Sequence, residues 1–117
     1  MDDEQGLVEI GEKKLGRLGY KVTGKTSSVE ALEVFLEHPD NFDLVITDMT
    51  MPNMTGKNLA LEMMRVRPEL PIIICTGFSE TMNEEKAEQA GFKGFMMKPL
   101  DFREMAGLIR KVLRGNT

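Results

Sequence analysis

Several side chains that can do chemistry lie at the ends of apolar, strand-like stretches. Asp48 follows "DLVIT", Thr76 follows "PIIIC", and Lys98 follows "GFMM". Asp2 and Asp3 stand just ahead of the first helical pattern. In parallel sheets, ligands bind outside the carboxyl ends of the strands. The spacing therefore predicts that carboxylates, a hydroxyl and an ammonium converge on one edge of a sheet.

This combination of groups suits phosphoryl transfer. Clustered carboxylates repel one another, and a hard, oxygen-binding cation such as Mg²⁺ stabilises them together. A carboxylate can attack phosphorus to give an aspartyl phosphate. Lys98 would neutralise one phosphoryl oxygen, and the Thr76 hydroxyl would donate to another. Because phosphoryl transfer depends mainly on positioning and charge stabilisation, these few groups suffice.

Each group taken singly also has a simpler interpretation. An aspartate after a strand is often a turn former or a helix cap, which applies to Asp48. Thr76 fits as a β-branched residue at the border of a core, and Lys98, ahead of Pro99, fits as a solvated lysine. An acidic N-terminus is often a solvated run of charge. Only the combination, in this order and at strand ends, supports a site.

The elements that must position these groups alternate along the chain. Helical patterns with capping or stop signals cover 4–19, 27–39, 56–68, 81–91 and 101–114. Strand patterns cover 20–27, which includes a turn, and 42–47, 70–76 and 93–97. Almost continuous apolar strands indicate burial on both faces, as in a parallel sheet covered by helices. The alternation predicts an α/β doubly wound sandwich.

Composition bounds the remaining possibilities. The 117 residues predict one domain, 1–117, and the 41% hydrophobic and 29% charged residues are ordinary for a globular protein. A net charge of −4 argues against nucleic acid as the main partner. No apolar run reaches the length of a membrane span, and no signal-peptide pattern opens the chain. The single cysteine, Cys75, fits a reducing cytoplasm and a buried apolar role better than a reactive thiol.

The chain resembles the receiver domains of two-component response regulators over residues 2–113. The resemblance is carried by five motifs in order: "DDE" at 2–4, "LGY" at 18–20, "DMTMPNMTG" at 48–56, "ICTG" at 74–77 and "KP" at 98–99. It implies a flavodoxin-like parallel sheet with strand order 2-1-3-4-5. As a set these motifs are highly specific to that family.

The resemblance also implies roles for individual residues. Asp48 would be the phosphoacceptor, and Asp3 with Asp2, Asp48 and the Thr50 backbone carbonyl would bind Mg²⁺. Thr76 and Lys98 would hold the phosphoryl group, and the peptide bond before Pro99 would be cis. Thr50 and Phe78 would line the mouth of the site and tune the lifetime of the phosphorylated state, and Phe95 would take part in the switch. Phe95 has two open interpretations, an aromatic that turns inward on phosphorylation and a plain core residue.

One departure from the family concerns the first strand. Receivers begin with an apolar strand ahead of the acidic pair, whereas this sequence begins with the pair at positions 2 and 3. The chain is therefore expected to be N-terminally truncated relative to the family, with an interior strand absent from the sheet. Three explanations stay open: a fragment or displaced start, a gap filled by another segment or molecule, or a rearranged sheet.

Three functions are compared on this basis. The first is a phosphoacceptor that takes a phosphoryl group from a histidine kinase or phosphotransfer protein and switches the surface of its fourth helix and fifth strand for a protein partner or a second copy. It would stand alone or form the receiver piece of a hybrid sensor kinase, and its only catalysis would be its own phosphorylation and dephosphorylation. The second is a non-phosphorylated pseudo-receiver that acts as a binding module. The third, an aspartate-dependent phosphatase, is disfavoured because Thr50 stands where such enzymes carry a second aspartate.

Overall fold

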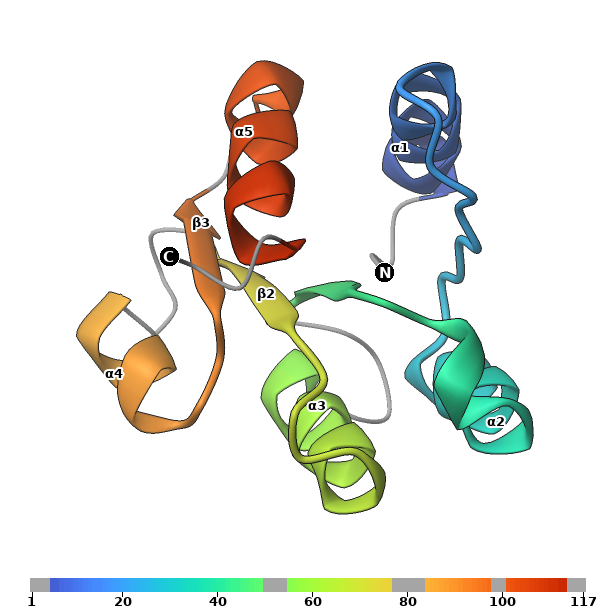
Figure 1. Ribbon diagram of the computed structural model, residues 1–117. Coiled ribbons are helices and arrows are strands. Elements are labelled where there is room, and N and C mark those ends of the chain that lie inside the picture. Colours follow the sequence, from blue (N-terminus) through green and yellow to red (C-terminus); the bar gives the residue numbers. More distant parts are fainter. Residues whose placement is uncertain (1–4, 50–54, 77–83, 98–100, 114–117) are drawn as a thin grey trace.

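A computed structural model describes residues 5–49, 55–76, 84–97 and 101–113 (Figure 1). The helices of this part are α1 (Gln5–Arg17), α2 (Ser28–Glu37), α3 (Gly56–Val66), α4 (Glu84–Gln89) and α5 (Phe102–Leu113), with a short 3-10 helix η1 (Pro39–Asn41). The strands are β1 (Val45–Asp48), β2 (Ile72–Thr76) and β3 (Gly94–Met97). The predicted alternation of helix and strand is confirmed from α2 onward.

Two helices end where the sequence predicts, and the same hydrogen-bond pattern ends both. After α1, the Tyr20 N–H donates to the Leu15 carbonyl at 3.3 Å and the Gly19 N–H donates to the Gly16 carbonyl at 3.0 Å. This pair of bonds requires a left-handed residue, which Gly19 supplies with φ of 97°. Gly91 (φ 93°) ends α4 in the same way. Glycine adopts this conformation without the steric cost that a Cβ would bring.

Three helices begin with a side chain that accepts from the first turn. The Ser27 hydroxyl accepts from the Glu30 N–H at 3.4 Å, and the Thr55 hydroxyl accepts from the Asn58 N–H at 3.2 Å. Asp101 accepts from the Arg103 N–H at 2.9 Å at the start of α5. The Ser27 and Asp101 caps confirm the sequence prediction. The predicted cap of α4, Thr81, lies outside the described residues.

The described strands form one parallel sheet in the order β1-β2-β3. Val45 is paired with Ile72 and Asp48 with Cys75, while Ile73 is paired with Gly94 and Thr76 with Met97. Figure 1 shows α1 and α5 on one side of the sheet and α2, α3 and α4 on the other. The sheet is thus covered on both faces, as the apolar strand patterns predict.

Each face of the sheet carries its own apolar core. On the α2, α3 and α4 side, Phe35, Leu59, Met63, Ile72 and Ile74 are buried together. On the α1 and α5 side, the buried cluster contains Leu15, Ile73, Cys75, Met96, Met105, Ile109 and Val112. Alternate residues of β2 therefore enter opposite cores, and every residue of β2 is buried. Cys75 is one of these buried core residues.

Two predictions about elements are wrong. Residues 20–25 form no strand, since the sheet of the described residues holds β1, β2 and β3 alone. A strand needs a hydrogen-bonded neighbour, and a cavity separates this segment from β1. Val66, expected on the same helix face as Leu59 and Met63, is 46% exposed because α3 has reached its last turn there.

No helix in the described ranges is long and apolar enough to cross a membrane.

Candidate functional site

The carboxyl ends of β1 and β2 bring two of the predicted site residues to one edge of the sheet. Asp48 is the last residue of β1 and is only 5% exposed, and Thr76 is the last residue of β2 and is fully buried. Asp48 is paired in register with Cys75, so Thr76 is one residue further along the neighbouring strand. The Met49 N–H extends this pairing by donating to the Cys75 carbonyl at 2.7 Å. The predicted convergence of a carboxylate and a hydroxyl at strand ends is therefore observed.

The backbone of Asp48 is held from two sides. The Thr47 hydroxyl donates to the Asp48 carbonyl at 3.2 Å, and the Thr47 side chain is fully buried. On the other side, Gly56 packs so closely that a Cβ there would lie 1.8 Å from the Asp48 carbonyl oxygen. The Gly56 N–H also donates to the Met49 carbonyl at 2.8 Å. The first residue of α3 is thus fastened directly to the end of β1, which fixes the backbone from which the carboxylate projects.

Thr47 and Thr55 were missed by the sequence analysis. Thr47 was part of the strand pattern "DLVIT" and gave no sign that its hydroxyl would bond to the next carbonyl. Thr55 stands three residues before Asn58, where a capping box would have Glu or Gln. A threonine directly ahead of a glycine and an apolar helical pattern is the signal that would have identified it.

Several predicted site residues lie outside the described residues. These are Asp2, Asp3, Thr50, Phe78, Lys98 and Pro99. Among the residues that the structure describes, no group of three or more His, Cys, Asp or Glu side chains could hold a metal ion. β3 ends at Met97, which is paired with Thr76. The carboxyl end of β3 is therefore at the same edge of the sheet as Asp48 and Thr76.

Phe95 lies in the middle of β3, paired with Ile74. Its side chain is half-buried and packs against the apolar core on the α2, α3 and α4 side of the sheet. Met97, two residues further on, is 42% exposed. The packing agrees with a core role in this state and leaves the switching role a prediction.

A model of the response regulator receiver domain matches residues 1–110 of the chain. The Arabidopsis thaliana two-component response regulator ARR11 is 34% identical over 114 residues, which are 97% of this chain and 22% of that protein. The probable transcriptional regulator ycf27 of Cyanidium caldarium is 31% identical over 97% of this chain and 45% of that protein. The chain thus spans less than half the length of these relatives.

The structural comparison agrees with the sequence comparison. The crystal structure of a response regulator receiver domain protein from Clostridium thermocellum superposes with a TM-score of 0.90 at 29% identity. It covers 97% of this chain and 90% of that one. The parallel sheet, the helices on its two faces and the matched family model lead to one assignment. The chain belongs to the response regulator receiver domain family of two-component signalling.

Proposed function

We propose that this chain accepts a phosphoryl group on Asp48 from a histidine kinase or phosphotransfer protein. A carboxylate oxygen of Asp48 attacks phosphorus, and an oxygen–phosphorus bond forms as the bond from phosphorus to the donor histidine nitrogen breaks. The electron pair of that bond stays on the imidazole, which takes up a proton. The product is an aspartyl phosphate, and attack by water on phosphorus reverses the modification.

The placement of Asp48 carries this proposal. It is the carboxylate that ends the apolar strand β1, at the carboxyl ends of the strands, where parallel sheets bind ligands. The Thr47 hydroxyl and the close packing of Gly56 hold its backbone in place. Thr76, which carries a hydroxyl, ends the neighbouring strand. Fixed positioning of the nucleophile is the main demand of phosphoryl transfer. A turn-forming aspartate would need none of these features.

The donor set that the sequence offers beside Asp48 fits Mg²⁺. It consists of the carboxylates of Asp2, Asp3 and Asp48 and the backbone carbonyl of Thr50, all oxygen ligands. When bound, the ion neutralises the charge of the carboxylates and of the incoming phosphoryl group. Lys98 and Thr76 would contact the remaining phosphoryl oxygens, Thr50 and Phe78 would flank the mouth of the site, and the bond before Pro99 would be cis.

The proposed output is a change of surface on α4 and β3. Thr76 would shift toward the phosphoryl group and Phe95 would follow it inward, which would alter the partners of α4 and β3. The downstream partner would be a protein or a second copy of this chain. The cytoplasm is the proposed location, with residues 1–117 acting as one domain.

The test is intact-mass spectrometry after incubation with acetyl phosphate and Mg²⁺. We expect one added phosphoryl group on the unchanged chain and none on Asp48→Asn. Asp43→Asn is the matched control, because Asp43 is an exposed carboxylate on the stretch that leads into β1 and should leave the modification unchanged. Modification of Asp48→Asn, or no modification of the unchanged chain at any Mg²⁺ concentration, would overturn the proposal.

A second candidate is the pseudo-receiver, a binding module that uses the fold without phosphorylation. The cavity beside β1 favours it, because a mainly apolar cavity could bind a partner without any reaction at Asp48. It predicts that Asp48→Asn leaves partner binding unchanged and that beryllofluoride has no effect on the chain. A change in the NMR signals of Phe95 and its neighbours on addition of beryllofluoride would exclude the pseudo-receiver.

A further inference from the structure

A cavity of about 740 Å³ lies between α1, residues 20–25 and β1. β1 pairs with β2 along one side, and the cavity follows its other side through Leu44, Val45, Ile46 and Asp48. Residues 20–25 form the opposite wall, where Tyr20 and Val22 line the space. The volume is within the range of sites that bind peptides and small molecules in proteins.

The walls above and below the cavity are apolar. Leu15 of α1 and Ile109 of α5 line it on one face of the sheet, and Ala31 and Phe35 of α2 line it on the other. A strand in this position would be covered on both faces, as β2 is. Such strands consist of nearly continuous apolar residues. Any occupant is therefore expected to be uncharged and apolar along its whole length.

The chain topology gives the occupant a direction. β1, β2 and β3 are neighbours in chain order, and the helices that connect them, α3 and α4, lie on one face. α2 lies on that face too and connects residues 20–25 to β1. Because parallel crossovers are right-handed in about 98% of cases, residues 20–25 belong beyond β1, on the side away from β2.

The position of α1 completes this argument. α1 lies on the opposite face with α5, so a right-handed crossover through α1 runs in the reverse direction along the sheet. A strand that led into α1 would therefore lie between residues 20–25 and β1, parallel to β1. The cavity occupies that position.

We propose that this cavity binds one extended apolar peptide, about as long as the five-residue β2, as an added strand parallel to β1. The peptide would exchange backbone hydrogen bonds with β1 and would give residues 20–25 a neighbour to pair with. Its side chains would enter the two apolar cores alternately. This binding does not depend on the proposed phosphorylation, because it uses the side of β1 and not the reactivity of Asp48.

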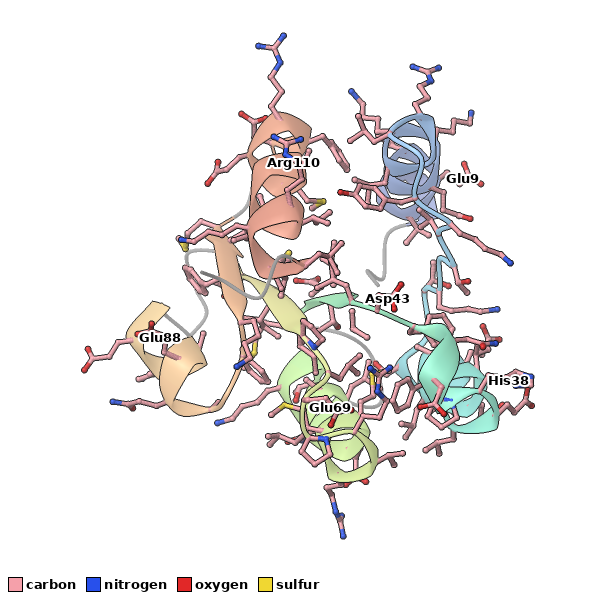
Figure 2. All side chains as sticks on the ribbon, in the orientation of Figure 1. Glu9, His38, Asp43, Glu69, Glu88 and Arg110 are labelled. Carbon is pink, nitrogen blue, oxygen red and sulfur yellow. The ribbon has the colours of Figure 1, made fainter. Side chains whose placement is uncertain are left out.

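The carboxylate at the end of β1 provides a test of the parallel orientation. Asp48 ends β1, whereas Asp43 precedes it, and both line the cavity (Figure 2 labels Asp43). In the parallel orientation the C-terminus of the peptide lies beside Asp48. A free C-terminal carboxylate would be repelled there, and an amidated end would not.

The chain carries its own reporter for the binding experiment. It has no tryptophan, and its one tyrosine, Tyr20, lines the cavity. The probe is an amidated peptide of five Val and Ile residues, with two Lys residues ahead of them for solubility. We expect saturable change in Tyr20 fluorescence and a rise in Tm of about 5 to 10 °C at large peptide excess. A peptide of the same length with Pro at alternate apolar positions is the control, because Pro cannot join the ladder.

Two further experiments test the orientation of the bound peptide and whether the same residues can fill the cavity when joined to the chain. The free-acid peptide should bind up to about tenfold more weakly than the amide, and Asp48→Asn should remove that difference. A variant with the same apolar residues fused ahead of Met1 should have a raised Tm and should no longer bind the free peptide. Equal binding of the Pro control, binding to the fused variant, or a Tm that depends on chain concentration without peptide would overturn the proposal.

Discussion

The two halves of the sheet differ in how completely they are packed. Around β2, helices cover both faces of the sheet and every residue of the strand is buried, whereas in the edge strand β3 only Met96 is buried. Around β1 and residues 20–25, a cavity of about 740 Å³ separates the two segments. The comparison teaches that a strand-like pattern alone does not make a strand. Residues 20–25 carry a strand pattern and form none, because no ladder partner lies within reach.

The largest effect is expected from paired isoleucines in the two halves. Ile73 of β2 and Ile46 of β1 are register partners on the same face of the sheet, but Ile73 is fully buried and Ile46 is half-buried beside the cavity. Ile73→Ala should lower the free energy of unfolding by about 2–5 kcal/mol, because it leaves a hole in a packed core. Ile46→Ala should cost roughly half of that or less, since its surroundings are already open.

Urea denaturation of the two variants measures this difference. Equal losses would mean that the half of the sheet around β1 is as well packed as the half around β2. The added-strand proposal would then lose its support, because β1 would not lie beside a poorly packed region.

The next effect is expected at the junction between the halves, at Gly56. A Cβ at this position would lie 1.8 Å from the Asp48 carbonyl oxygen, and that neighbour is backbone, which cannot move aside like a flexible side chain. Gly56→Ala should therefore lower the free energy of unfolding by about 1–3 kcal/mol and reduce phosphorylation by acetyl phosphate.

Gly107→Ala is the matched control for Gly56→Ala. Gly107 is inside α5, and a Cβ there meets no atom within 4 Å. It should raise the free energy of unfolding by about 0.5–1 kcal/mol, because alanine loses less backbone entropy than glycine on forming a helix. A Gly56→Ala variant as stable as the unchanged chain would show that α3 does not hold the end of β1.

A comparable effect is expected at Arg67, which joins α3 to the connection between α2 and β1. Its guanidinium donates to the Pro39 carbonyl at 2.8 Å and to the Phe42 carbonyl, and its side chain is only 19% exposed. Arg67→Ala should cost about 1–3 kcal/mol of unfolding free energy, because two carbonyls lose their charged donor.

Arg65→Ala provides the comparison for Arg67→Ala. Arg65 is in the last turn of α3, which Arg67 directly follows. Its side chain is 76% exposed, and its 3.2 Å ion pair with Glu62 lies in solvent. Such pairs contribute about 0.2–0.5 kcal/mol. Thermal unfolding of the two variants shows whether Arg67 stabilises the fold more than a solvent-exposed arginine does. Similar Tm values for both variants would mean that the hydrogen bonds of Arg67 to Pro39 and Phe42 do not stabilise the fold.

The sequence predicted the parts of the fold that local signals and apolar patterns determine. Gly19 and Gly91 stop their helices as predicted, and the strand at Ile72–Thr76 follows from its uninterrupted apolar run. The ends of β1 and β2 at Asp48 and Thr76 follow for the same reason. These features depend on residues close together in the chain, so one sequence suffices to find them.

The sequence failed where the outcome depended on distant neighbours. Residues 20–25 have a strand-like sequence, and only the structure shows that a cavity lies between them and β1, where a pairing strand would have to be. The close approach of Gly56 to the Asp48 carbonyl is likewise a tertiary contact. The contact with Gly56 joins residues on two elements, and no periodic pattern encodes it.

The smallest effect is expected at the caps of the two helices that line the cavity from opposite faces of the sheet. Asp101 accepts from the Arg103 N–H at 2.9 Å at the start of α5, whereas Ser27 accepts from the Glu30 N–H at the longer distance of 3.4 Å at the start of α2. Asp101→Ala should cost about 1 kcal/mol, and Ser27→Ala less, because its bond is longer and weaker. Asp101→Asn and Ser27→Asp retain an accepting oxygen and should restore most of each loss. Hydrogen exchange in the first turns of α5 and α2 gives a local readout that global unfolding would blur. A larger loss at Ser27 than at Asp101 would contradict this order and would mean that the length of the capping bond does not decide how much each cap stabilises its helix.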